Sequence, residues 1–497
     1  MFLDALKRKL PIALSVLTIS LFTTHITRAR GIFPALTPSL EDTGGEWFLT
    51  KIKADTIVKK LSCGRGTFVV LIDSGVETDH PDLKDHLRLD LAYDFGDNDT
   101  DVTDLLGHGT ATAGLVAKIA PCAQIIPLKI NPEGADYFED EALIRALNYT
   151  LRLVRSIKGN WIVNMSLSVA TPSEEITGLI HQLRQEGAIL VGASGNEGKS
   201  NTVDYPASLP EVLAISSTTN TDTPYPESNC GRQTFISAPG EELSVPWLNG
   251  SHITLSGTSL SAALVSGTIA ILKELGDKHP DLSLAQGSDD IEEPGWDTCT
   301  GFGRLNIEES ILSYLSKDLP VFPSHLNLSP GETTAVFFAP DSYLRVLNQN
   351  EEKTEIVGFN PQKGLLILTP ISTGENRLYL YALNDLYKAS RIEINSTFDS
   401  EGYLDILIYP RVLSSNSKLC AALHPESKNI HHLTLTLTYS QTGSFVKQTL
   451  WEGNFTLRTD PLITCIPVTP FSFTSGIQEL LLCGDHLPCS RTIFTVE

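Results

Sequence analysis

Hydrophobic residues in the first two thirds of the chain follow two alternating patterns. Short, continuous apolar runs such as 67–72 are typical of strands that are buried on both faces of a parallel sheet. Between these runs, apolar residues recur at helical spacing, as they do over residues 139–157. Because strands and helices alternate over residues 66–316, we predict a doubly wound, mostly parallel α/β sheet. The other apolar runs of this kind are 125–130, 161–167, 188–193 and 212–216.

The pattern changes after about residue 318. Helical spacing ends, and short apolar or alternating runs appear with Gly, Asn and Ser between them, which is typical of β structure. A chain of 497 residues is long enough for two to four domains. We therefore predict an α/β domain over residues 47–318, followed by two small all-β, sandwich-like domains over residues 319–398 and 399–497.

The first residues have the pattern of an export signal. Three basic residues at 7–9 precede an apolar run at 10–22, which is too short for a membrane span but suits a signal peptide. Cleavage after Ala29 would remove residues 1–29 and leave 30–46 as a short linker or pro-segment. We therefore expect a secreted or extracytoplasmic protein without a membrane span; the alternative is an uncleaved anchor that tethers the chain to the membrane.

The composition excludes some partners. The net charge of −22 repels nucleic acid and anionic membranes, so we expect neither as a partner. All eight cysteines lie beyond the signal, and an even number in an exported chain indicates disulfides. There is no C-x-x-C pair, so a structural zinc site is not expected.

Three separated motifs hold the groups that nucleophilic catalysis requires. Asp73 ends the apolar run in V-V-L-I-D-S-G, His108 stands in G-H-G-T-A-T-A-G, and Ser259 stands in S-G-T-S-L-S-A-A-L-V-S-G. Alone, each motif is typical of a turn or a helix cap. Together they offer a nucleophile, a base beside it and a carboxylate to orient the base.

In the order Asp, His, Ser, these motifs resemble those of the subtilisin-like serine proteases, the subtilases, over residues 47–316. The resemblance implies a subtilisin-like fold and a serine endopeptidase without a cofactor, acting on protein or peptide substrates. It implies that Ser259 attacks the peptide bond, His108 moves the proton and Asp73 orients His108. Asn196, in V-G-A-S-G-N-E-G, would donate to the oxyanion. The alternative is a catalytically idle subtilase-like protein that serves binding or adhesion.

The same resemblance implies where a substrate binds. Asp204 stands at the floor of the pocket for the residue before the scissile bond, where the family commonly has glycine. A carboxylate there would favour Lys or Arg, whereas an Asp turned to solvent or capping a loop would not. The implied substrate-binding residues are Ser166, Leu167, Ser168, Ala193, Ser194, Gly195 and Asp204.

The chain departs from the family between His108 and the next strand. The helix at 107–119 leads almost directly into the strand at Ile125, without room for the family's calcium-binding loop. We therefore expect that calcium site, of which Asp82 resembles one ligand, to be absent, and no metal to be bound. Because the subtilase sheet brings the flanking strands together, the resemblance predicts a disulfide between Cys63 and Cys122, which leaves Cys230 and Cys299 to pair with each other.

Overall fold

The computed structural model describes residues 30–33, 37–38, 45–54 and 61–316, together with most of 319–396. From 404 to 496 it describes the backbone of the strands. The signal expected at residues 1–29 lies outside the described residues.

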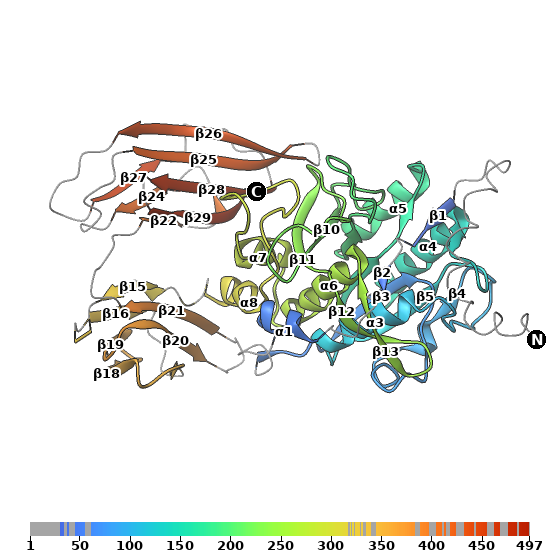
Figure 1. The fold of residues 1–497 in the computed structure, drawn as a ribbon, viewed down its shortest axis with the longest axis horizontal. Coiled ribbons are helices and arrows are strands. Elements are labelled where there is room, and N and C mark those ends of the chain that lie inside the picture. Colours follow the sequence, from blue (N-terminus) through green and yellow to red (C-terminus); the bar gives the residue numbers. More distant parts are fainter. Residues whose placement is uncertain are drawn as a thin grey trace, which may run out of the picture.

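A seven-stranded parallel sheet forms the centre of the α/β domain (Figure 1). Its first strand in the chain, β3, is buried along its whole length, because helices cover both faces of the sheet. This confirms the doubly wound, mostly parallel sheet that the sequence predicts. In spatial order the strands are β11 (Thr234–Pro239), β10 (Val212–Thr218), β9 (Ile189–Ala193), β7 (Asn160–Met165), β3 (Thr67–Asp73), β5 (Gln124–Lys129) and β4 (Tyr93–Asp94).

Alternate residues of β3 enter two different hydrophobic cores. Val69 and Leu71 belong to the core that includes residues of α3 (His108–Ile119) and α6 (Thr258–Glu274). Val70 and Ile72 belong to the core that includes residues of α4 (Asp140–Ser156) and α5 (Glu174–Gln185). The shorter helices are α1 (Trp47–Lys51), α7 (Pro280–Gly287) and α8 (Ile307–Leu315).

Two small three-stranded sheets complete the domain. The strand β1 (Arg30–Ile32) lies between β6 (Tyr137–Glu139) and β8 (Ser168–Val169). The strand β13 (Ser251–Ser256) lies between β12 (Leu243–Trp247) and β2 (Thr37–Pro38). All four of these contacts are antiparallel.

The C-terminal part is built from small, mainly antiparallel sheets (Figure 1), which confirms the predicted β structure. Two four-stranded sheets enclose a core of their own, in which Val336, Leu366 and Leu380 are fully buried. Two further sheets follow. The strands are β14 (Val321–Phe322), β15 (His325–Leu328), β16 (Thr334–Phe338), β17 (Arg345–Asn348), β18 (Thr354–Asn360), β19 (Leu365–Pro370), β20 (Gly374–Ala382), β21 (Lys388–Ser396), β22 (Leu404–Tyr409), β23 (Val412–Leu413), β24 (Lys418–Leu423), β25 (His432–Gln441), β26 (Ser444–Asn454), β27 (Leu462–Pro467), β28 (Gly476–Gly484) and β29 (Leu487–Val496).

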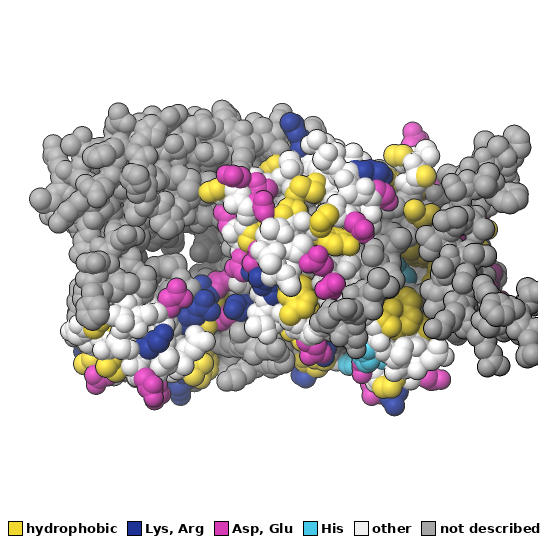
Figure 2. All heavy atoms as spheres, in the orientation of Figure 1, with side chains coloured by type: hydrophobic (Ala, Val, Ile, Leu, Met, Phe, Trp, Pro, Cys, Tyr) yellow, Lys and Arg dark blue, Asp and Glu magenta, His cyan; other side chains and the backbone are white. Residues whose placement is uncertain are grey.

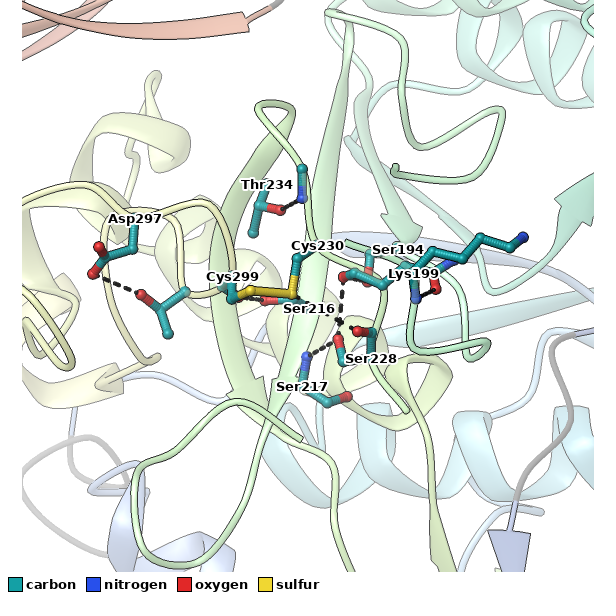
Figure 3. The surroundings of a disulfide bond; sticks show 12 residues. Ser194, Lys199, Ser216, Ser217, Ser228, Cys230, Thr234, Asp297 and Cys299 are labelled. Carbon is teal, nitrogen blue, oxygen red and sulfur yellow. Dashed lines mark hydrogen bonds between the residues drawn. A yellow bond between two sulfur atoms is a disulfide. The ribbon is translucent and has the colours of Figure 1, made fainter. Parts of the chain in front are cut away.

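Two disulfides close loops of the α/β domain. Cys63 pairs with Cys122, and Cys230 pairs with Cys299, as the sequence analysis expected. Figure 3 shows the second bond beside Ser216, whose hydroxyl donates to the carbonyl oxygen of Cys299 at 2.5 Å. Each bridge joins segments that are 59 or 69 residues apart and restricts the unfolded chain accordingly.

The described surface is acidic, and none of its helices could cross a membrane. Figure 2 shows Asp and Glu side chains scattered over the described face, in keeping with the net charge of −22. Among the described helices, none combines the length and the apolar character of a membrane span.

Candidate active site

Three elements bring an imidazole between a carboxylate and a hydroxyl. Asp73 is the last residue of β3, His108 is the first residue of α3, and Ser259 is the second residue of α6. The Nδ1 atom of His108 lies 2.6 Å from Asp73 Oδ1, and its Nε2 atom lies 3.0 Å from Ser259 Oγ. All three residues are buried, with exposed fractions of 1%, 6% and 0%.

Asp73 is held by its own strand end and by α3. Its Oδ1 atom accepts from the backbone N–H of Ser74 at 2.7 Å, and its Oδ2 atom accepts from the hydroxyl of Thr112 at 3.1 Å. The start of α3 approaches the strand so closely that a Cβ atom at Gly109 would lie 2.0 Å from the carbonyl oxygen of Gly75. Glycine at position 109 therefore allows the histidine to reach the carboxylate.

A second buried carboxylate, Asp104, fixes the start of α3. Its Oδ1 atom accepts from the backbone N–H of Gly107 at 2.9 Å and from the hydroxyl of Ser74 at 2.9 Å. Its Oδ2 atom accepts from the backbone N–H and the hydroxyl of Thr110 at 2.9 and 2.8 Å. Sequence reasoning missed this residue, because Asp104 stands four residues before the first residue of α3 and the N-cap position itself is Gly107.

The surroundings of His108 favour its protonated form. Burial alone would lower the pKa of the imidazole, but the carboxylates of Asp73 and Asp104 outweigh it, and the pKa is raised above its ordinary value. Burial is also the main reason why the pKa of Asp104 is raised. The site can therefore stabilise the imidazolium that forms when the base takes a proton.

Asn196 contacts the start of the nucleophile helix. Its Oδ1 atom accepts from the backbone N–H of Thr258 at 2.9 Å and from the hydroxyl of Thr258 at 2.8 Å. An N–H group can only donate, so this contact identifies the oxygen of the amide and directs its nitrogen elsewhere. The nitrogen is the group that the oxyanion role would use.

The predicted substrate-binding residues fall into two groups. The Ser166 hydroxyl donates to the carbonyl oxygen of Ser259 at 3.2 Å, so this residue supports the nucleophile helix. Leu167 and Ala193 are fully buried, and the hydroxyl of buried Ser194 donates to a backbone carbonyl at 2.9 Å. Gly195 adopts φ +109°. Among these five residues, Ser166 contacts a triad residue, Ser259, and the role of all five in substrate binding stays a prediction.

Asp204 and Ser168 form the second group. The Oδ2 atom of Asp204 accepts from the Ser168 hydroxyl at 2.8 Å, and its Oδ1 atom accepts from the Asn229 side chain at 3.1 Å. The ammonium of Lys199 lies 3.8 Å away, and 13% of the Asp204 side chain is exposed. The carboxylate is thus bound within the protein rather than turned to solvent. Burial is the main reason why its pKa is raised.

Asp82 has a different partner from the one that the family's calcium loop would supply. Its Oδ2 atom lies 2.8 Å from the Nε2 atom of His252. Within the described part of the chain, no three His, Cys, Asp or Glu side chains are grouped so that they could hold a metal ion. The absence of the calcium site stays a prediction.

The hydroxyl of Ser259 contacts the imidazole of His108, which contacts the carboxylate of Asp73, and all three belong to a domain built on a doubly wound parallel sheet. This arrangement defines the α/β domain as a serine endopeptidase of the subtilisin type. The subtilase family model matches residues 64–289, and this part of the chain belongs to that family.

Curated bacterial proteases resemble the same region. A thermophilic serine proteinase of Bacillus sp. (strain AK1) is 28% identical over 256 residues, which is 48% of this chain and 60% of that protein. The major intracellular serine protease of Bacillus subtilis (strain 168) is 29% identical over 237 residues, which cover 45% and 73%. Subtilisin BL of Lederbergia lenta is 27% identical over 270 residues, which cover 52% and 93%. The similarity thus spans about half of this chain.

Proposed function

We propose that the whole protein hydrolyses peptide bonds by means of Asp73, His108 and Ser259. The observation that carries this proposal is the placement of His108, 2.6 Å from the carboxylate and 3.0 Å from the serine hydroxyl. His108 Nε2 takes the proton of Ser259 as its Oγ attacks the carbonyl carbon, and then gives that proton to the leaving amine. Water next adds to the acyl-enzyme by the same route and releases the acid.

The oxyanion of each tetrahedral intermediate needs donors. The Asn196 amide nitrogen and the backbone N–H of Ser259 are our candidates. Thr258 orients the Asn196 side chain, and Ser259 stands in the first turn of α6, where the N–H groups have no partner within the helix. In subtilisin, one such donor contributes about 10²–10³ in kcat.

A fluorophosphonate probe tests the nucleophile. The wild-type protein should be labelled, and Ser259→Ala should not. Ser261→Ala is the matched control, because the Ser261 hydroxyl lies on the same helix but donates to the carbonyl oxygen of Ala238 at 3.0 Å. Folded protein that takes no label, both as wild type and as the Gly31→Leu variant described below, would favour the alternative, an idle protein that serves binding or adhesion.

We also propose a preference for Lys or Arg before the scissile bond. The support is Asp204, a mostly buried carboxylate that already has a cation, Lys199, at 3.8 Å. A substrate cation would replace Lys199, whose side chain is 49% exposed and can move into solvent. Peptides that differ only at that residue should favour Arg over Leu by about ten-fold or more, and Asp204→Asn should remove the difference. A wild-type preference for Phe or Leu would overturn this part.

We infer that the protein is exported after cleavage behind Ala29. The signal-like start and the two disulfides of the α/β domain support this, because disulfides persist in oxidising compartments. N-terminal sequencing of exported protein should give Arg30 first, whereas membrane-bound protein with an intact start would show the anchor instead. We also propose the division into domains at 318 and 398, which limited proteolysis can test.

A further inference from the structure

The N-terminal strand β1 occupies a place beside the triad. It pairs in antiparallel fashion with both neighbours, so that Gly31 lies opposite Phe138 of β6 and Val169 of β8. Ile32 lies opposite Ser168, one of the residues predicted to contact substrate. Because both edges of β1 are paired, the cleft between β6 and β8 already holds an extended chain.

The two described stretches of this segment lie close to the triad residues His108 and Ser259. The ring of Phe33 lies 5.3 Å from the ring of His108, measured between centroids. The strand β2 pairs with the end of β13, where Thr37 lies opposite Ser256, three residues before Ser259. His108 and Ser259 are both buried, so a peptide from solution does not reach them in this state.

The side chains of β1 alternate as those of a bound peptide do. Ile32 points outward and is 48% exposed, whereas Phe33 is 8% exposed. Gly31 and Phe33 share the inward face, where Phe138 contacts both: its ring centroid lies 5.4 Å from that of Phe33. Specificity along this path therefore depends on what the inward face accepts.

The inward face accepts only glycine at position 31. A Cβ atom built there would lie 2.0 Å from Cζ, 2.2 Å from Cε2 and 2.8 Å from Cε1 of Phe138. The Phe138 side chain is completely buried and packs against Phe33, so its ring cannot move aside without disturbing other contacts. Phe138 thus fills the space that a side chain at position 31 would need.

We propose that residues Arg30–Phe33 occupy the path of a peptide substrate, and that Phe138 restricts the residue in the place of Gly31 to glycine. Phe33 shows what the path accepts two residues later, an aromatic ring against His108. Residues of the chain itself therefore fill the substrate path before a substrate binds. We expect the substrates to be peptides that have glycine at one position and an aromatic residue two positions later. This inference rests on the proposed function and names its substrate class.

Labelling of the full-length protein by a fluorophosphonate tests two claims: that β1 occupies the substrate path, and that Phe138 restricts position 31 to glycine. Gly31→Leu should expel β1 and raise the labelling rate by about ten-fold or more, because the leucine side chain would overlap the buried Phe138 ring. Gly45→Leu is the control, because a Cβ atom there meets only the backbone nitrogen of Trp47, at 3.9 Å. Removal of the ring should make room for the leucine, so Gly31→Leu with Phe138→Ala should return the rate toward that of wild type.

A synthetic peptide defines the ligand class. Capped Arg-Gly-Ile-Phe should slow the labelling of the Gly31→Leu protein, and capped Arg-Leu-Ile-Phe should be weaker by about ten-fold or more. Equal labelling of wild type and Gly31→Leu would overturn the occupancy of the path. Equal inhibition by the two peptides, or a double variant as fast as Gly31→Leu, would overturn the role of Phe138.

Hydrogen exchange separates this inference from the proposed function. If no variant takes label, the proposed function fails, but the placement of β1 can still be measured. The backbone amides of Tyr137–Glu139 should then exchange faster in Gly31→Leu than in wild type or Gly45→Leu, by about ten-fold or more. Unchanged exchange would show that β1 does not occupy this cleft.

Discussion

The interior and the surface of the α/β domain both pair histidine with aspartate, and the two pairs differ in their surroundings. Asp73 and His108 are 2.6 Å apart, with side chains 1% and 7% exposed. Asp82 and His252 are 2.8 Å apart, but their side chains are 51% and 49% exposed. Water and ions weaken the exposed pair, so similar distances do not mean similar interaction energies.

Two ion pairs, one formed by a lysine and one by an arginine, show the same contrast between a buried and an exposed pair. Lys129 and Asp94 are 2.7 Å apart at the ends of β5 and β4, and their side chains are 5% and 1% exposed. Arg155 and Glu186 are 2.8 Å apart on the surface, with side chains 50% and 38% exposed. Burial, rather than distance, decides which carboxylates this protein depends on.

The largest expected effect concerns the two Asp–His pairs. Asp73→Asn should lower kcat by about 10⁴, the magnitude known for triad aspartates, because the imidazole loses its orientation and its countercharge. Asp82→Asn should leave kcat unchanged. Peptide hydrolysis by the two purified variants measures the difference. A comparable loss in both variants would contradict the distinction between the buried and the exposed pair.

The buried lysine gives the next largest effect. Lys129→Met should lower the free energy of unfolding by about 3–5 kcal/mol, because the Asp94 carboxylate stays buried without its cation. Arg155→Met should cost at most about 1 kcal/mol. Urea unfolding of both variants gives the two values, and a loss below about 1 kcal/mol for Lys129→Met would contradict the comparison.

Glu274 is an intermediate case, half-buried at the end of α6. Its Oε2 atom accepts from the Ser62 hydroxyl at 2.7 Å and from the backbone N–H groups of Cys63, Gly64 and Arg65 at 2.7–2.9 Å. We expect Glu274→Gln to lower the free energy of unfolding by about 1–2 kcal/mol, less than for a fully buried charge. Thermal unfolding of wild type and variant at neutral pH measures this.

The pH dependence of that loss tests its cause. Burial would raise the pKa of Glu274, but hydrogen bonds from Ser62 and the three backbone N–H groups lower it below its usual value. The stabilisation is therefore present above the usual glutamate pKa and is lost as the pH falls through the lowered value. A difference between wild type and Glu274→Gln that grew as the pH fell would contradict this assignment.

The smallest effect is a shift in the pH profile. Hydrolysis needs neutral His108, so kcat/KM should rise with pH around a midpoint above the ordinary histidine pKa. Asp104→Asn should move this midpoint to lower pH, because the Asp104 carboxylate helps to raise the pKa of His108. His252→Gln should leave the midpoint unchanged, and an equal shift in both variants would refute the assignment.

The sheet and the triad were predictable because their signals are local. A strand buried on both faces has to be apolar throughout, as 67–72 is, and Asp73 follows it directly. The helix expected over 139–157 is observed as α4 at Asp140–Ser156, since its apolar residues recur at helical spacing.

The contacts around the site were less predictable because partners far apart in the sequence decide them. The sequence alone allowed Asp204 to face either a substrate pocket or the solvent. In the structure its carboxylate binds Ser168 and Asn229, which are 36 and 25 residues away in the chain. The three residues of β1 have no apolar pattern of their own, and their extended state comes from pairing with β6 and β8. The β propensity of the residues themselves does not predict such strands.

Because of the Glu274 contacts, the length of α6 sets the position of Ser259 relative to the loop before β3. The helix carries the nucleophile in its first turn and is tied through its last residue to the loop that leads into β3, the strand of Asp73. Its 17 residues span roughly 25 Å at about 1.5 Å per residue. One inserted residue would rotate Ser259 by about 100° relative to that tether, so the length of this helix is as much a requirement of the triad as the identity of its members.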